Sequence, residues 1–407
     1  MNILCAFSQF NYGDRARGQS HEFSHFIPAL CRLGNSIDHF ETRDRSGSRG
    51  FADLNRALLE RVERTKPDVI IAAQTHYELW SETWDIIRTG SNCATVNWAT
   101  DDSWKYSQFS RFLAPSFHAV ATTCPASVQR YANDGISQVL LTQWACDSGN
   151  LLSPLPAAQC CRKISFVGTA TRERRAWIAD LAKRGVHVDC FGHGWPHGPV
   201  DGSVIRRIVR ESVISLNFSG NRGIFGHRQR QLKARTFEVP GAGGFLLTED
   251  ADGLDRYFTP GMDVATFRSL DELQNQIDHF TNDVGARDDI ARSGHARAAR
   301  EHTYEQRLAD VLEFACARRD AAVDRTCTAP APTIDWSRYE EAERRYARAT
   351  PLRGVLQPIE LLCQACWGPV RGRRAFRRIL FETCWRLDGA SVYSASGLPG
   401  RLFYDVS

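Results

Sequence analysis

Residues 166–175 read Phe166-Val167-Gly168-Thr169-Ala170-Thr171-Arg172-Glu173-Arg174-Arg175. A short apolar run that passes through a Gly/Thr loop into a charged helix is the strand–loop–helix unit of a parallel α/β sheet. The first turn of such a helix has unpaired N–H groups and a partial positive charge, so it can bind a diphosphate. An ordinary turn before a solvated basic helix has the same pattern, and this stretch alone does not separate the two interpretations.

The same alternation of strand and helix extends in both directions along the chain. Apolar runs typical of buried strands occur at 3–8, 69–73, 94–99, 119–123 and 138–142, and again at 163–167, 186–191, 213–217, 245–248 and 264–267. Between the two sets, residues 147–162 contain two prolines and no periodicity, which indicates a hinge. Two open α/β units joined by a hinge predict a ligand cleft at the carboxyl ends of their strands.

We therefore predict three parts: Rossmann-like domains at 1–150 and 163–320, and a helical extension at 334–407. An Ala-, Pro- and Thr-rich linker, 321–333, precedes the extension. The extension is too apolar for an unpacked tail, so we expect it to pack back on the first domain. A helix on a membrane surface is the competing interpretation, because residues 371–387 mix Arg with Phe, Ile, Leu and Trp.

The composition excludes several classes of protein. The 407 residues are 43% hydrophobic and 24% charged with a net charge of +4, which is typical of a soluble globular protein and not of a general nucleic-acid binder. The 13 cysteines are scattered and often lie in apolar runs, so we expect reduced thiols and no metal site. Neither a signal peptide nor an apolar run of the ~20 residues that a spanning helix needs is recognisable. The expected location is the cytoplasm.

A second informative segment lies at residues 233–249. Glu238 precedes the glycine-rich turn 241–244 and the apolar strand 245–248. A carboxylate at that point can accept hydrogen bonds from both hydroxyls of a ribose, and glycines allow backbone amides to approach a ligand closely. The alternative is that Glu238 forms a structural ion pair with Arg235, three residues earlier on a helical turn.

This segment resembles the donor-site signature of group 1 glycosyltransferases, in particular the subgroup typified by the spore maturation protein CgeB. Other segments agree with that subgroup in the same order: 96–104, 166–169, 191–195, 214–217 and 302–307. The resemblance spans roughly residues 1–315. It implies a GT-B fold, in which two Rossmann-like doubly wound domains face a central cleft. It also implies that the acceptor binds to the first domain and the nucleotide-sugar donor mostly to the second.

The resemblance further implies a role for individual residues. Glu238 is similar to the second Glu of the family's Glu-x7-Glu pattern and would bind the ribose. The first Glu would fall at position 230, which is Arg here, so a retaining and an inverting outcome both stay open. With arginines and a helix end to neutralise the diphosphate, we expect no metal and no cofactor besides the donor. The expected donor-binding residues are Gly168, Thr169, Arg172, Gly194, Asn217, Arg230, Arg235, Glu238, Gly243 and Gly244.

An inverting transfer also needs a base for the acceptor hydroxyl. Loops at the strand ends of the first domain offer Asp14, His21, Glu22, His76, Asp101 and Asp102. Of these we predict His21 and Asp102 as catalytic residues.

The sequence therefore predicts a metal-independent transferase that moves a sugar from a nucleotide-sugar to a glycan or other hydroxyl acceptor. Two alternatives remain. One is a non-catalytic GT-B protein that binds a glycan or nucleotide, which the missing first Glu keeps open. The other is a nucleotide-sugar epimerase. Peripheral contact with the inner face of a membrane, through the extension, is open as well. The base, the sugar, the acceptor and the oligomeric state are not identified by the sequence.

Overall fold

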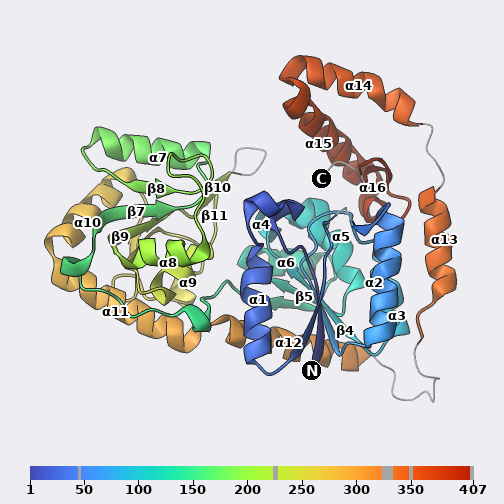
Figure 1. Ribbon diagram of the computed structural model, residues 1–407, viewed down its shortest axis with the longest axis horizontal. Coiled ribbons are helices and arrows are strands. Elements are labelled where there is room, and N and C mark those ends of the chain that lie inside the picture. The colour runs from blue at the N-terminus through green and yellow to red at the C-terminus, as the bar shows by residue number, and fades with distance from the viewer. Residues whose placement is uncertain (45–46, 223–227, 323–332, 348–351, 404–407) are drawn as a thin grey trace. The chain divides into compact units, whose positions relative to one another are not determined.

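The computed structural model describes residues 1–407 except 45–46, 223–227, 323–332, 348–351 and 404–407. The described residues form two compact units. The first comprises residues 1–142 and 309–407, and the second comprises residues 143–308. Figure 1 labels their helices and strands. Most of the predicted linker 321–333 lies outside the described residues.

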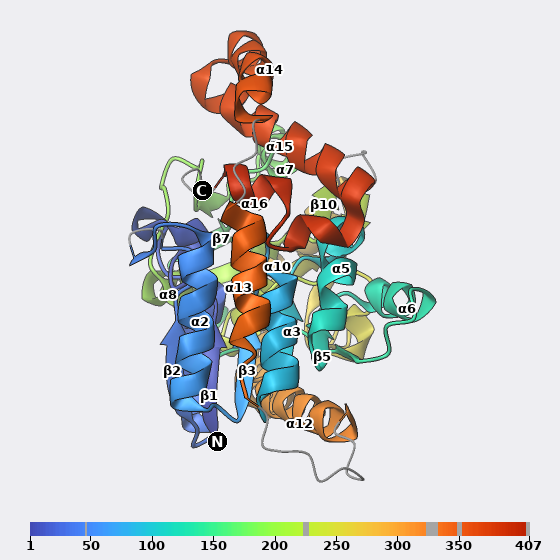
Figure 2. The ribbon, with the colours of Figure 1, turned by 90° about the vertical axis from the view of Figure 1, so that its right-hand side faces the viewer.

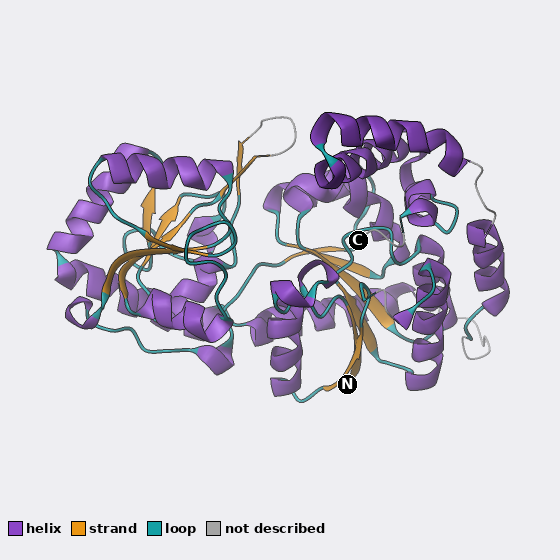
Figure 3. Ribbon diagram, turned by 45° about the horizontal axis from the view of Figure 1, so that its top comes forward, coloured by secondary structure: helices purple, strands orange, loops and turns teal. Residues whose placement is uncertain are grey.

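The first unit contains a six-stranded parallel sheet in the order β2-β1-β3-β4-β5-β6. Its strands are β1 (Asn2–Ala6), β2 (Ser36–Phe40), β3 (Val69–Ala72), β4 (Ala94–Ala99), β5 (Ala119–Thr122) and β6 (Val139–Leu141). The central strands β3 and β4 are buried on both faces because helices cover both sides of the sheet (Figure 3). The strand order reverses at β1, which pairs with β2 on one edge and with β3 on the other. In open α/β sheets, ligands bind at the carboxyl ends beside such a reversal.

Two helices of this unit begin where the sequence supplies a cap or a proline. Ser20 caps α1 by accepting a hydrogen bond from the N–H of Phe23 at 3.1 Å, and Pro125 begins α6. The helices are α1 (His21–Arg32), α2 (Phe51–Thr65), α3 (Ser81–Gly90), α4 (Asp102–Lys105), α5 (Arg111–Leu113) and α6 (Pro125–Asn133).

The second unit repeats the plan with a five-stranded parallel sheet in the order β13-β12-β9-β7-β8. Its strands are β7 (Arg162–Val167), β8 (Asp189–Phe191), β9 (Ser212–Asn217), β12 (Leu246–Glu249) and β13 (Ala265–Phe267). A separate antiparallel pair joins β10 (Gly220–Arg222) to β11 (Arg228–Arg230). The helices are α7 (Arg172–Lys183), α8 (Gly202–Arg210), α9 (Arg235–Gly241), α10 (Leu270–Asn282) and α11 (Val284–Glu301). α12 (Tyr304–Ala322) begins in this unit and ends in the first.

The hydrogen bonds of Cys146 account for the boundary at 142/143. Its N–H donates to the carbonyl of His302 at 2.9 Å, and its carbonyl accepts from Tyr304 at 3.0 Å. Residues 143–150, which we had placed in the first domain, therefore lie with the second unit, and residues 309–320 lie with the first.

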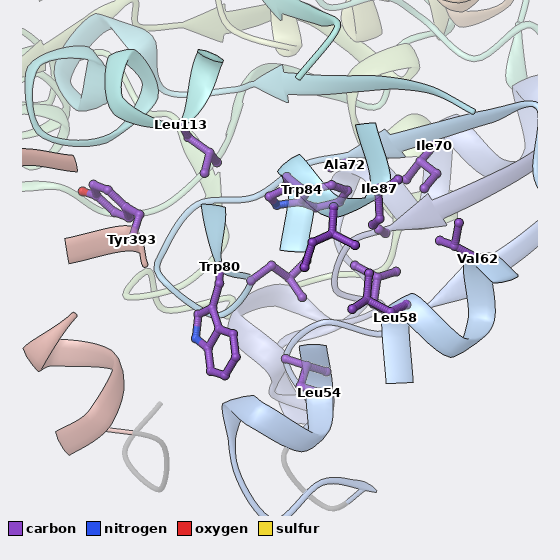
Figure 4. Packing of buried hydrophobic residues seen from close by; sticks show 14 of the residues in the cluster. Leu54, Leu58, Val62, Ile70, Ala72, Trp80, Trp84, Ile87, Leu113 and Tyr393 are labelled. Carbon is purple, nitrogen blue, oxygen red and sulfur yellow. The ribbon is translucent and has the colours of Figure 1, made fainter. Parts of the chain in front are cut away.

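The remaining helices belong to the first unit: α13 (Trp336–Ala347), α14 (Leu352–Trp367), α15 (Pro369–Asp388) and α16 (Leu398–Leu402). Figure 2 shows α13 alongside α2 and α3. There the buried Tyr339 donates its hydroxyl proton to the carbonyl of Ala52 at 2.8 Å. Tyr393 is also fully buried, in one apolar cluster with Trp80, Trp84 and Leu113 (Figure 4). Aromatic side chains thus attach residues from beyond position 333 to the helical layer of the first sheet.

No helix within the described ranges has both the length and the apolarity required to cross a membrane.

Candidate active site

Two loops at the carboxyl ends of the adjacent strands β7 and β8 hold each other in place. The N–H of Gly168 donates to the carbonyl of Phe191 at 2.8 Å, and the indole N–H of Trp195 donates to the carbonyl of Gly168 at 2.9 Å. Gly192 has a φ of +120°, and a Cβ there would lie 2.5 Å from the oxygen of Gly168. Only glycine allows the loops to approach this closely. The Gly168 loop is therefore fixed before any ligand arrives.

The helix that follows, α7, leaves polar groups at its N-terminus open to solvent. The hydroxyl of Thr171 caps it by accepting from the N–H of Arg174 at 3.3 Å. Thr169 and Arg172 are exposed, and within the described ranges no hydrogen bond or ion pair engages the side chain of Arg172. Gly194 is exposed on the facing loop, where its carbonyl accepts from Arg175 at 2.7 Å. Four predicted donor-site residues, Gly168 included, thus lie at this end of the sheet.

Two guanidinium groups meet beside the same loop. Arg235 donates to the carbonyl of Val167 at 3.1 Å, and Arg174 donates to the carbonyl of Thr169 at 3.1 Å. Burial, followed by the charge of Arg235, lowers the pKa of Arg174. An anion bound here would relieve the repulsion between the two cations. Arg174 was not among the predicted residues, although its place in the first turn of α7 was visible in the sequence.

Glu238 forms an ion pair with Arg235 within α9. The side chain of Glu238 is 19% exposed and that of Arg235 is 26% exposed, so both are partly accessible to solvent. The ion pair that we considered as an alternative role is therefore present. It does not prevent Glu238 from binding a ribose, because a carboxylate has about four acceptor positions.

Asn217 and Arg230 have partners within the protein, and their predicted roles in donor binding stay predictions. Asn217 is 2% exposed and donates to the hydroxyl of Thr248 on the neighbouring strand at 2.9 Å. A guanidinium nitrogen of Arg230 lies 3.5 Å from the carboxylate of Glu249, which is fully buried. The positive charge at position 230 is thus balanced within the protein, and Asn217 joins strands.

Glu249 itself is a site-adjacent residue that the sequence analysis missed. Besides Arg230, its carboxylate accepts hydrogen bonds from the N–H groups of Ser219 and Gly220, at 3.1 and 3.0 Å. It therefore holds the start of β10 to the end of β12. In the sequence, the one indication of this role was the position of Glu249 at the end of an apolar run typical of a buried strand.

Gly243 and Gly244, also predicted to bind the donor, have packing roles in the structure. Their N–H groups donate to the carbonyls of Pro240 and Val239, both at 2.9 Å, as the C-terminal end of α9 requires. A Cβ on Gly243 would lie 2.3 Å from the oxygen of Leu152, and one on Gly244 would lie 2.8 Å from that of Val209. Both glycines are buried and allow segments of the chain to pack, so their amides are not directed at a ligand.

In the first unit, the two predicted catalytic residues have different surroundings. His21 begins α1, is half-buried, and stacks on His25 with ring centres 4.2 Å apart. Asp102 is 1% exposed and accepts a hydrogen bond from the hydroxyl of Tyr131 at 2.9 Å. Burial raises the pKa of Asp102. Its side chain faces the interior, and its catalytic role stays a prediction.

Glu22, beside His21, has the electrostatics that a base requires. Burial, with a further contribution from the Asp101 carboxylate, raises the pKa of Glu22. Glu22 lies in α1, the first α-helix after β1, and Asp101 lies just after β4, so each follows the carboxyl end of a strand of the first sheet. Glu22 was one of the six candidates from the sequence but not one of the two preferred.

A buried charged cluster at the same edge was not predicted at all. Lys105 donates to the carbonyl of Thr75 at 3.0 Å, and Arg43 donates to the Thr75 hydroxyl at 2.9 Å. Arg43 also lies 3.7 Å from one oxygen of Glu78, whose other oxygen is buried without a hydrogen-bond partner in the described part of the chain. Burial lowers the pKa of Lys105 to about 8. These groups come from α4 and from loops that are distant from it in sequence.

Comparison with known proteins agrees with this architecture. Residues 172–313 match the family model described as glycosyl transferase-like. No curated protein matches the chain.

Solved structures of similar fold include a glycosyltransferase from Rickettsia africae, with a TM-score of 0.55 and 11% identity over 78% of this chain and 98% of that one. Sucrose-phosphate synthase from Thermosynechococcus elongatus has a TM-score of 0.52 and 11% identity over 79% of this chain and 100% of that one. Anabaena HepE in complex with UDP and glucose has a TM-score of 0.52 and 14% identity over 77% of this chain and 99% of that one. The predicted fold class, GT-B with a helical C-terminal part, is confirmed. The CgeB-like subgroup stays a prediction.

Proposed function

We propose that this protein, a glycosyltransferase of the GT-B fold, moves a sugar from a nucleotide-sugar donor to a hydroxyl of a glycan or other acceptor. The observation that carries the proposal is the convergence of Arg174 and Arg235 on the exposed N-terminus of α7. The crystallised complex of HepE with UDP and glucose supports a uridine diphosphate sugar as the donor class.

In this proposal the second unit stabilises the leaving diphosphate. The first N–H groups of α7 would bind its oxygens, and Arg172, Arg174 and Arg235 would supply charge-assisted hydrogen bonds. Donors fixed before the reaction stabilise the charge that develops on the leaving group at little cost in reorganisation. Three cations and a helix end can replace a divalent metal in this role, so the proposed reaction is metal-independent. Glu238 would accept hydrogen bonds from the ribose hydroxyls.

The first unit would supply the acceptor chemistry. We retain His21 as a candidate base and add Glu22, because the raised pKa of its carboxyl group suits proton abstraction better than that of an ordinary glutamate. Asp102 stays the weaker of the two predicted bases, since its carboxylate is buried and accepts a hydrogen bond from Tyr131.

A non-catalytic nucleotide-binding protein is the second candidate function. It is favoured by one observation: Arg230 occupies the position of the family's first glutamate and is balanced by the buried Glu249. A site that has lost this carboxylate and compensated the replacement internally could bind a donor without turning it over.

Two measurements test these functions. The first is a thermal-shift screen with UDP-, GDP-, dTDP- and CMP-sugars, in which a ligand at a hundred times its dissociation constant adds about 2.7 kcal/mol of stability. The second follows the release of the nucleoside diphosphate, with and without a chelator. We expect one nucleotide class to stabilise the protein and slow donor hydrolysis to persist in the chelator. Binding without any hydrolysis or transfer would favour the non-catalytic function, and loss of turnover in the chelator would contradict metal independence.

A further inference from the structure

The helical hairpin α14–α15 is closely packed on its inner side. Gly372 of α15 touches α14, and a Cβ there would lie 2.3 Å from the Cα of Gln364. Cys363, Phe376 and Phe403 form a small buried cluster at this junction. Figures 1 and 2 both show α14 on the outer side of α15. α14 therefore has one covered face and one that its own unit leaves open.

The open face of α14 is apolar. Ile359 and Leu362 are 44% and 64% exposed, and Cys366 is exposed one turn further on. Positions i, i+3 and i+7 share one side of a helix, so these three side chains form a stripe. Trp367 follows at the end of the helix and is 54% exposed. A contiguous apolar surface of this kind on a folded protein marks an interaction site.

The adjoining helix α15 is strongly basic. Arg371, Arg374 and Arg378 follow the same i, i+3, i+7 spacing, and all three are exposed. None of them has a carboxylate at ion-pair distance among the residues that the structure describes, whereas the neighbouring Arg373 lies 3.8 Å from Glu360. The hairpin therefore carries an exposed apolar stripe on α14 and, on α15, a row of exposed guanidinium groups without a carboxylate partner in the described part of the chain.

Apolar and cationic groups also meet in a cavity between α14, α15 and α16. The cavity has a volume of about 520 Å³, and its lining includes Leu356, Phe376 and Phe403 together with Arg373 and Arg377. A lining that combines apolar side chains with two guanidinium groups suits a molecule that has a hydrocarbon part and an anionic part.

We propose that the α14–α15 hairpin docks on an anionic membrane surface. The stripe of Ile359, Leu362 and Cys366 would enter the boundary between headgroups and acyl chains, and the row of arginines would contact lipid phosphates. A second copy of this chain is a poorer occupant, because a symmetric contact at this hairpin would bring two rows of like charge together. The proposal does not depend on the transferase activity. If both hold, the protein would act on acceptors at a membrane surface.

The test is vesicle flotation of the full-length protein. We expect it to float with vesicles of phosphatidylcholine and phosphatidylglycerol, to remain unbound with phosphatidylcholine alone, and to dissociate as salt screens the arginines. The double variant Ile359→Ser/Leu362→Ser should lower the bound fraction about tenfold at a fixed lipid concentration, because it removes two of the three stripe residues.

A matched set of charge variants tests whether vesicle binding depends on the arginines of α15 or on the positive charge of the protein in general. The triple variant Arg371→Gln/Arg374→Gln/Arg378→Gln should lose binding to the same extent as the serine variant. The control Arg64→Gln/Arg338→Gln/Arg344→Gln removes three exposed charges from α2 and α13 of the same unit and should bind like the wild type. All substituted side chains are exposed, so the melting temperature should not change.

Four results would overturn the proposal. These are absence of flotation by the wild type, equal flotation with neutral vesicles, equal loss in the control variant, and a dimer in sedimentation equilibrium that the double serine variant abolishes. The last result would identify the stripe as a self-association surface.

Discussion

Replacement of Glu238 by alanine should weaken donor binding much more than it weakens the fold. Each hydrogen bond from a ribose hydroxyl to this carboxylate would contribute about 1.5–3 kcal/mol, because one partner is charged. Two such bonds give an upper limit of about 3–6 kcal/mol. The substitution also releases Arg235 from its ion pair, and the released guanidinium can bind the diphosphate more strongly. We therefore expect a net loss of roughly 2–4 kcal/mol, or between about 30-fold and 1000-fold in affinity.

The effect on stability should be small for a structural reason. The ion pair of Glu238 with Arg235 is partly exposed and lies within one helical turn, and such pairs contribute about 0.3–1 kcal/mol. The melting temperature should fall by no more than a few degrees. Glu301→Ala is the control in the same unit, since it removes exposed ion pairs of the same kind, with Arg297 and Arg300. The side chain of Glu301 is 39% exposed. This control should keep the wild-type affinity.

The assay is calorimetric titration with the nucleoside diphosphate found in the thermal-shift screen, beside a melting curve for each variant. Unchanged affinity in Glu238→Ala, together with a melting temperature lowered as in Glu301→Ala, would refute the reasoning. Glu238 would then be a structural partner of Arg235, and the residues that bind the donor would have to be identified among the neighbours of Arg174.

Three further predictions follow from buried groups. Burial lowers the pKa of Lys105 to about 8. Above this pH the folded protein releases a proton from Lys105 that the unfolded chain still holds, so the free energy of unfolding rises with pH. Urea unfolding should show the wild type gaining about 2 kcal/mol relative to Lys105→Met between pH 7.5 and 9.5; a constant difference would contradict the assignment. Burial also lowers the pKa of His118 to about 4, so the wild type should lose about 2 kcal/mol relative to His118→Asn as the pH falls from 7 to 5. An equal pH dependence of the free energy of unfolding in the two proteins would contradict this prediction. Gly243→Ala places a Cβ against the oxygen of Leu152 at a φ of +75°, and we expect chemical denaturation to show a loss of about 2–4 kcal/mol. Wild-type stability would show that this turn can relax.

The sequence was sufficient for the parts of the fold that depend on local chemistry. The apolar runs at 3–8 and 163–167 correspond to β1 and β7, because strands buried on both faces are predominantly apolar. The predicted helix at 21–33 corresponds to α1, where Ser20 supplies the cap. The Gly168 loop followed from the same reasoning, since a strand, a glycine and a helix start are adjacent in the chain.

The identity of the groups that point into a site was decided by tertiary structure. Asp101 and Asp102 are neighbours in sequence, yet Asp102 faces Tyr131 because α4 begins there, and a four-residue helix is too short to reveal its buried side through periodicity. The internal role of Gly243 depends on Leu152, which is 91 residues earlier in the chain. Arg230 and Glu249 meet only because β11 and β12 lie close together in the fold. Pairings of this kind depend on contacts between distant segments, and composition and spacing contain no record of them.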